Sequence, residues 1–210
     1  MTPAAARLAF YNEALRLLGE RPLASLTENR EPRRILDSVW DAGAIDYVLE
    51  QGQWQFAMRT ISLTYSPSVE PPFGYRFAFD KPEDLIRVTS VCTDEYFTTP
   101  NLNYTDEAGF WFTDDETIYV KYVSSHVNYG YDLSLWPQTF LKYVAAYFAS
   151  ESCSALNKSE STEQKIRSIL KERHKDAMAK DSMAEPTKML PMGRWVTSRY
   201  GGINRRDRGR

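Results

Sequence analysis

The apolar and polar positions in the first 52 residues recur at helical spacing and predict two helices. Thr2 suits the N-cap of the first helix, and the proline at position 3 suits its first turn. Gly19 suits the left-handed residue that ends it. The second helix is predicted from Pro32 to about Gln51, with Gly52 as its stop. Their apolar stripes are Leu8, Tyr11, Leu15 and Leu18 in the first helix, and Leu36, Val39, Trp40, Gly43 and Tyr47 in the second.

After Gly52 the pattern becomes that of β-strands. Residues 54–65 alternate between two faces, and the prolines at positions 67, 71 and 72 end this strand because proline has no backbone N–H to donate to a sheet. Residues 73–79 form a second predicted strand with alternating aromatic side chains. A turn that contains a proline then leads to a third strand over residues 85–93.

The next part of the chain predicts a β-hairpin. Residues 98–107 are read as a loop, and residues 109–113 and 117–124 are read as strands. An acidic turn at positions 114–116 joins these two strands. The β-rich part of the chain therefore ends with two strands expected to pair with each other.

Helical spacing returns for two further helices. The third helix is expected to begin at position 134 or 136, and it is apolar over so much of its circumference that we expect it at the centre of the helices. The fourth carries a capping-box signature, Ser161-x-x-Gln164, and continues to about Asp181. Its apolar stripe is narrow, so it is expected on the outside.

These elements predict an α+β chain in which a four-helix bundle contains a β-rich antiparallel insertion between helices 2 and 3. Residues 1–52 and 134–183 are the expected halves of the bundle, and residues 53–133 are the insertion. Residues 184–210 are expected to form an extended C-terminal arm, because prolines and glycines interrupt them too often for an autonomous fold.

Charge separates the arm from the rest of the chain. Residues 187–210 contain seven basic side chains and one acidic side chain, a formal net charge of +6. The whole chain carries −2, so the first 186 residues carry −8 and the molecule is polarised. No apolar run approaches the ~20 residues that span a bilayer, and the first 20 residues lack the features of a signal peptide. We therefore expect a protein that is made and kept in a cytosol.

The change from helix to strand carries a family resemblance. The residues concerned are, in order, Trp54-x-Phe56-Ala57-x-Arg59, Gly74-Tyr75, Phe79-Asp80-x-Pro82-x-Asp84-Leu85-x-Arg87-Val88 and Trp136-Pro137-x-x-Phe140. In this order and spacing, with a helix before them and a proline-rich link after the first motif, the chain resembles the adaptor proteins of tailed bacteriophages. It is most similar to the tail tubular protein A family of short-tailed phages, over residues 4–185.

The resemblance implies a structural virion protein of the tail and neck, assembled in the host cytoplasm. Copies of such a protein form a ring, expected to be dodecameric, that docks on the portal protein and offers its other face to the tail nozzle or the next tail protein. Genomic DNA passes through the channel without sequence-specific binding. No catalysis, cofactor, metal or membrane contact is expected of such a protein.

The C-terminal arm is the candidate binding site. A solvated linker would not keep so many large apolar side chains, since their exposure favours aggregation. The resemblance implies that the arm orders on the portal, and aromatic and arginine side chains are the types that dominate interface energetics. The candidate portal-binding residues are Met189, Leu190, Met192, Arg194, Trp195, Arg199, Tyr200, Ile203, Arg205 and Arg206. Two alternatives are that the arm folds back onto its own body, and that its arginines contact DNA.

Other candidate sites have a structural interpretation beside the functional one. Asp114, Asp115 and Glu116, and a second group of Asp80, Glu83 and Asp84, could serve a hydrolase or a divalent cation, but solvated turns are favoured. His126 and His174 lack ligand partners at metal-binding spacing, and Trp54, Trp111 and Trp136 are better explained as core or subunit contacts than as a stacking platform. Cys92 and Cys153 form no CxxC pair, so neither a disulfide nor a thiolate site is expected.

Two other functional classes stay open. A glycan-degrading tail enzyme would need two of these carboxylates about 5 to 10 Å apart in a cleft. A DNA-binding module would use the basic arm and would bind with a steep dependence on salt concentration. The phosphate-binding loop, the Gly-x-Ser-x-Gly elbow and the HExxH helix are all missing from the sequence.

Overall fold

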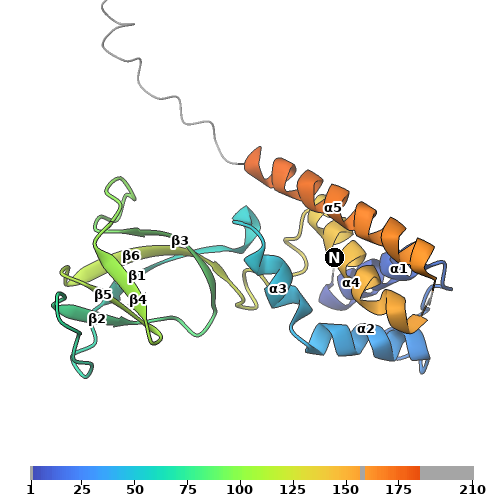
Figure 1. Ribbon diagram of the computed structural model, residues 1–210, viewed down its shortest axis with the longest axis horizontal. Coiled ribbons are helices and arrows are strands. Elements are labelled where there is room, and N and C mark those ends of the chain that lie inside the picture. Colours follow the sequence, from blue (N-terminus) through green and yellow to red (C-terminus); the bar gives the residue numbers. More distant parts are fainter. Residues whose placement is uncertain (1, 157–158, 185–210) are drawn as a thin grey trace, which may run out of the picture.

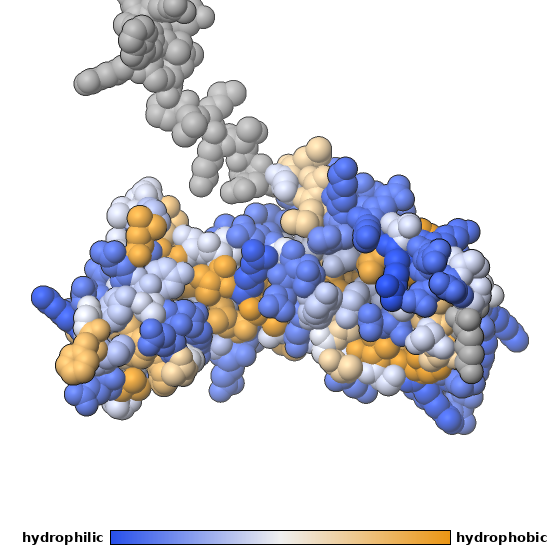
Figure 2. All heavy atoms as spheres, viewed as in Figure 1, coloured by the Kyte–Doolittle hydropathy of each residue, from blue (hydrophilic) through white to orange (hydrophobic). Residues whose placement is uncertain are grey.

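The computed structural model describes residues 2–156 and 159–184. These residues form five α-helices, one 3₁₀-helix and six strands in two antiparallel sheets. The molecule is elongated: the helices gather at one end and the sheets at the other (Figure 1). We call residues 2–57 with 125–184 the helical lobe, and residues 58–124 the β lobe. In the view of Figure 2 both lobes are largely hydrophilic, with separate hydrophobic patches.

Helix α1 spans Pro3–Leu18 and has both predicted ends. The hydroxyl of Thr2 accepts a hydrogen bond from the Ala5 backbone N–H at 3.4 Å. At the other end Gly19 has a φ of 78°, in the left-handed region where glycine is favoured. The Glu20 N–H then donates to the Leu15 carbonyl at 2.9 Å, which closes the helix. Local capping chemistry thus fixes this element.

The predicted second helix is in fact two helices. Helix α2 spans Glu31–Asp41 and helix α3 spans Ala44–Glu50. Gly43 between them has a φ of 83°, a conformation that ends a right-handed helix and turns the chain. The prediction of one continuous helix was wrong because apolar spacing continues across this break.

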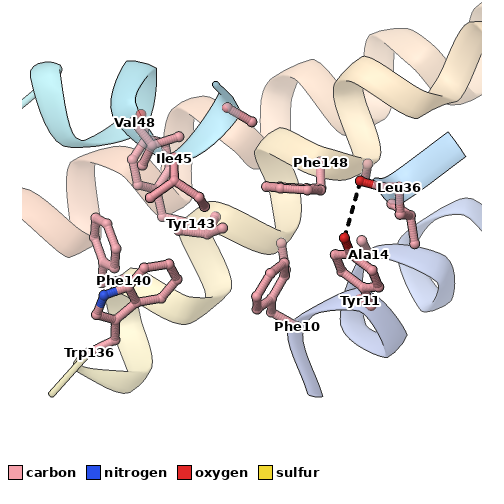
Figure 3. Packing of buried hydrophobic residues seen from close by; sticks show 14 of the residues in the cluster. Phe10, Tyr11, Ala14, Leu36, Ile45, Val48, Trp136, Phe140, Tyr143 and Phe148 are labelled. Atoms are coloured by element: carbon pink, nitrogen blue, oxygen red, sulfur yellow. Dashed lines mark hydrogen bonds between the residues drawn. The ribbon is translucent and has the colours of Figure 1, made fainter. Parts of the chain in front are cut away.

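Helix α4, Gln138–Leu156, lies at the centre of the helical lobe, as predicted. It contacts α1, α2, α3 and α5. Figure 3 shows its aromatic side chains facing α1 and α3, with Phe148 beside Phe10 and Tyr143 beside Ile45 and Val48. The ring centroids of Phe148 and Phe10 lie 5.2 Å apart, and Phe140 packs against Trp136, which precedes α4. The buried Tyr11 hydroxyl donates to the Leu36 carbonyl at 3.2 Å and so ties α1 to α2 (Figure 3).

Helix α5, Glu160–Ser182, covers α4 from outside. Only Ile166 and Ala177 of this helix are buried, so its predicted outer position is confirmed. The predicted capping box was wrong: Ser161 lies inside the helix, and Ser159 occupies the N-cap position. The carboxylate of Glu13 on α1 binds the guanidinium of Arg173 on α5 at 2.9 Å.

The β lobe contains two three-stranded sheets. Strands β1 (Met58–Thr64), β6 (Thr117–Ser124) and β3 (Leu85–Cys92) form the first, in the order β1-β6-β3. Strands β2 (Phe77–Asp80), β5 (Phe110–Thr113) and β4 (Tyr104–Glu107) form the second, in the order β2-β5-β4. A separate core between them contains Phe79, Val91, Trp111, Ile118, Val120 and Tyr122.

Three strand predictions were wrong. The first strand begins at Met58 rather than at Trp54, because residues Gln55–Ala57 form the 3₁₀-helix η1. Phe73 is fully exposed and precedes β2 instead of starting it. Part of the predicted loop at residues 98–107 is strand β4, which pairs with β5 through a turn at Ala108 and Gly109.

The predicted hairpin between residues 109–113 and 117–124 does not form. Strand β5 pairs with β2 and β4, whereas β6 pairs with β1 and β3, so the acidic turn connects two different sheets. Ala108 and Gly109 have φ values of 49° and 88°, as a tight two-residue turn requires. The true hairpin was missed because its turn lacks the Asn or Asp that usually marks one.

Gly130 supplies the first testable prediction. It lies in the connection from β6 to α4, where its N–H donates to the Ser124 carbonyl at 3.0 Å and its carbonyl accepts from the Trp136 indole at 2.8 Å. A Cβ atom here would stand 2.2 Å from the Ser124 oxygen, a severe clash with backbone. We expect Gly130→Ala to lower the free energy of unfolding by about 2 kcal/mol in urea titrations. Asn128→Ala, an exposed change in the same connection, is the control and should stay within about 0.5 kcal/mol.

Candidate functional site at the lobe junction

The first part of the resemblance motif fixes the chain where it leaves the helical lobe. Trp54 is buried, and its indole N–H donates to the Val48 carbonyl of α3 at 3.2 Å. Its ring lies 4.8 Å from that of Phe140, and the ring of Phe56 lies 4.7 Å from the same side chain. Gly52 permits this arrangement, since a Cβ there would meet the Trp54 ring at 2.8 Å. The motif therefore anchors the start of the β lobe to α4.

The end of α5 holds the same segment from the other side. The carboxylate of Asp181 accepts from the Gln55 backbone N–H, at 3.1 and 3.2 Å to its two oxygens. From the β lobe, the Arg87 guanidinium donates to the Glu50 carbonyl of α3 at 3.2 Å. A pocket of 240 Å³ lies between these contacts, lined by Gly52, Gln53, Trp54, Gln55, Arg87, Met178, Asp181 and Ser182. We call this region the lobe junction.

Asp84 is the polar centre of the second part of the motif. Its Oδ2 accepts from the Arg59 guanidinium at 2.8 Å and from the Ser124 hydroxyl, and its Oδ1 accepts from the Tyr122 hydroxyl at 3.1 Å. Its backbone carbonyl accepts from the Ser125 N–H at 2.8 Å. One carboxylate thus links the turn before β3 to the first strand and to the end of β6.

The pKa values at this centre follow from burial and from these partners. Burial alone would raise the pKa of Asp84, but the hydrogen bonds from Ser124, Arg59 and Tyr122 hold the pKa below its ordinary value. Burial, followed by the hydrogen bond to Asp84, raises the pKa of the Tyr122 phenol to about 12. The carboxylate therefore stays ionised and the phenol stays protonated at neutral pH, an arrangement that stabilises structure.

The candidate carboxylates divide into two kinds. Asp114 and Glu116 are exposed, which agrees with a solvated turn. Asp115 accepts from the Asn101 side-chain amide at 2.8 Å and so holds the β3–β4 connection. The interpretation of Asp84 as part of a solvated turn was wrong, because its carboxylate is among the best-satisfied polar groups of the β lobe. Sequence reasoning missed this role since the partners lie far along the chain.

The three candidate tryptophans do not form a common stacking platform. Trp54 and Trp136 lie in the core of the helical lobe, and Trp111 lies in the core of the β lobe. The Trp111 indole N–H donates to Asp106 at 3.2 Å. Core packing, the favoured interpretation, is therefore confirmed for all three. The cysteines are also buried in different lobes, and they form no disulfide with each other.

The two histidines lie in different surroundings. His126 is in the connection after β6, where its Nδ1 accepts from the Asn128 N–H at 3.2 Å. His174 is on α5 with its ring 4.8 Å from that of Tyr143 on α4. The Nε2 atom of His174 is buried and has no hydrogen-bond partner in the described part of the chain, and burial lowers the pKa of this side chain. The described residues contain no group of three or more His, Cys, Asp and Glu side chains suited to a metal ion.

His174 gives a prediction on pH. Because its pKa is lower in the folded than in the unfolded chain, protonation favours unfolding. The stability that neutral His174 contributes is present above the unfolded pKa of about 6.5 and is lost as the pH falls through the folded pKa. We expect the urea midpoint to fall between about pH 7 and about pH 5, and His174→Phe to remove most of that fall. His126→Gln should leave the fall unchanged; an equal effect of both variants would contradict this role of His174.

All ten candidate portal-binding residues, at positions 189–206, lie outside the described residues. The sequence matches no family model and no curated protein. Within residues 2–156 and 159–184, none of the helices is both long enough and apolar enough to cross a membrane. The candidate site that the structure does describe is thus the lobe junction, where the motif residues at positions 54–59 and 84–87 come together.

Proposed function

We propose that the chain is a head-to-tail adaptor of a tailed bacteriophage. One observation carries the proposal: the motif residues at positions 54–59, 84–87 and 136–140 gather where the helical lobe meets the β lobe, whereas those at positions 74–80 lie within the β lobe. Trp54 fixes the helical side, Asp84 and Arg59 fix the start of the β lobe, and Arg87 joins the lobes directly. Residues that hold two lobes in one orientation stabilise the shape of a subunit. Such a fixed shape is expected of a component of a larger assembly.

A closed ring requires every subunit to present its two contact surfaces at one fixed rotation. A protein whose lobes turned freely about residues 52–58 would form irregular or open chains. The contacts of Asp181 with η1 and of Arg87 with α3 support a rigid subunit. In the proposed architecture, helices α1, α4 and α5 form a four-helix bundle in which α2 and α3 together take the place of the remaining helix. The β lobe is an insertion between the two halves of this bundle.

In this proposal about twelve copies surround the DNA channel. The arm at residues 184–210 docks on the portal, and another face of the ring receives the tail nozzle or next tail protein. The channel passes genomic DNA without sequence-specific contacts, in keeping with an acidic body that carries −8. Two carboxylates that a hydrolase could have used, Asp84 and Asp115, are engaged in structural hydrogen bonds, which favours the adaptor over the glycan-degrading enzyme.

The test is to mix the purified protein with portal oligomers and to measure the mass of the products. We expect a ring-sized complex in addition to the portal, with the subunits countable in end-on electron micrographs. The isolated chain can be monomeric, since some rings close only on a template. If no higher-order species forms with portal under any condition, the adaptor proposal is wrong.

A further inference from the structure

Strand β4 has a free edge that the proposed function does not use. In the order β2-β5-β4 this strand lies at the edge of its sheet. Glu107 and Phe110 flank the two-residue turn and bond to each other, so the N–H and C=O groups of Tyr104 and Asp106 point away from β5. No backbone group within the described residues bonds to them. An unpaired edge of this kind is a template for another strand.

The other edge strands differ from β4. On β2 the carbonyl of Ala78 accepts from the Ser66 N–H at 2.7 Å, so that edge is already covered in part. On β3 the Val91 carbonyl accepts from the Asn101 N–H at 2.8 Å. The edge of β1 is also open, but its exposed side chains, Thr60, Ser62 and Thr64, carry no charge.

Acidic and apolar side chains surround the β4 edge. The bond between Asn101 and Asp115 brings the acidic turn at positions 114–116 to the start of the strand. Glu107 is exposed at its other end, and the side chain of Leu102, just before the strand, is 85 % exposed. The β lobe as a whole contains eleven acidic and five basic side chains, a formal net charge of −6. The surface therefore fits an extended segment that is both basic and aromatic.

The chain itself contains such a segment outside the described residues. Residues 194–200 read Arg-Trp-Val-Thr-Ser-Arg-Tyr, between Gly193 and Gly201. Trp, Val, Thr and Tyr are strand-favouring types, and the flanking glycines set the limits of a short strand. Prolines interrupt the residues before it, so a sheet edge supplies the partner that the segment cannot make for itself. In the parallel direction, a register that places Trp195 opposite Leu102 would place Arg199 opposite Asp106.

We propose that residues 194–200 add to the β4 edge of their own chain as an extra strand while no portal is bound. The charge of +6 on residues 187–210 equals the −6 of the β lobe with opposite sign. The described chain ends at Ala184, at the end of α5 that lies nearest the β lobe (Figure 1). Attachment to the same chain gives the segment a high effective concentration, which favours its own β lobe over a neighbour's.

The docked arm would be held away from the portal until the portal competes for it. The added strand goes beyond the proposed adaptor function and is a property of the isolated chain, whereas its release by the portal rests on that function. When the portal competes, the hydrogen bonds between the added strand and β4 would be replaced by contacts with the portal. Trp195 and Tyr200 would then become available for docking.

The experiment measures hydrogen exchange of the Tyr104 and Asp106 amides in the full chain. The outward N–H groups exchange slowly only if a strand covers them. Val196→Pro removes an N–H from the added strand, and we expect exchange at these amides to become about tenfold faster, with β6 amides unchanged as the internal reference. Thr187→Pro, outside the segment, is the matched control and should leave the rates as they are.

Equal rates in Val196→Pro and the unsubstituted chain would overturn the proposal. Protection that grows with protein concentration would also overturn it, since that result assigns the segment to a neighbouring copy. High salt and Glu107→Lys should each speed exchange at Tyr104 and Asp106, because both weaken attraction to the arginines. Portal binding is measured separately, so a failed adaptor test leaves these rates interpretable.

Discussion

Replacing Asp84 with alanine is expected to lower the free energy of unfolding by about 3 kcal/mol. The reason is that the Arg59 guanidinium and the hydroxyls of Tyr122 and Ser124 would lose the carboxylate that accepts their hydrogen bonds. The side chain of Asp84 is 15 % exposed and that of Arg59 is 32 % exposed, so solvent offsets only part of the loss. Urea titration followed by circular dichroism measures the change. Asp80→Ala, an exposed substitution in the same turn, should stay within about 0.5 kcal/mol.

The effect of Asp84 also has a pH dependence of known sign. Its pKa is lower in the folded chain, so the ionised carboxylate stabilises the fold above the unfolded pKa of about 3.9, and this contribution is lost as the pH falls further. The difference in stability between the unsubstituted chain and Asp84→Ala should therefore shrink in acid. A second variant, Arg59→Met, tests the pair. If Asp84→Ala and Arg59→Met add without coupling, the ion pair does not stabilise the junction.

Sequence reasoning succeeded where the determinants are local. Helix α1 was predicted with both ends because Thr2 and Gly19 act within a few residues of themselves. It failed at Gly43, because a glycine inside an apolar period looks like a small residue on a helix face, whereas its φ of 83° breaks the helix. It also assigned Trp54 to a strand, since an aromatic residue in an alternating run fits a sheet as well as it fits the groove beside α4.

Strand pairing and buried polar contacts depend on residues far apart in the sequence. The pairing of β6 with β1 and β3 could not be read from the acidic turn that precedes β6, because a turn favours a local hairpin only when nothing more distant pairs better. Asp84 and Ser124 are 40 positions apart, so no local sequence pattern predicts the hydrogen bond between them. The resemblance motif contains residues of the lobe junction, but the sequence analysis named no site there, and the site it named, in the arm, lies outside the described residues.

Deletion of the chain from Leu190 onward is expected to leave a soluble, helical body that no longer joins the portal. Helix α4 and the four helices that contact it all end before this point, and both described cores lie within residues 2–184. We therefore expect the truncated chain to keep a cooperative urea transition. Binding, in contrast, should be lost, because the arm supplies the aromatic and arginine anchors of the proposed interface.

Two finer variants separate the anchors from the charges. Trp195→Ala with Tyr200→Ala should weaken docking by a few kcal/mol per subunit if these side chains fill pockets on the portal. Neutralising Arg205, Arg206 and Arg208 should mainly slow association and reduce its dependence on salt. Each attachment is expected to be modest because ordering the arm costs conformational entropy, while a ring of copies on one portal gains from effective concentration. Co-sedimentation with portal decides: stoichiometric binding by the truncated protein would show that another surface docks.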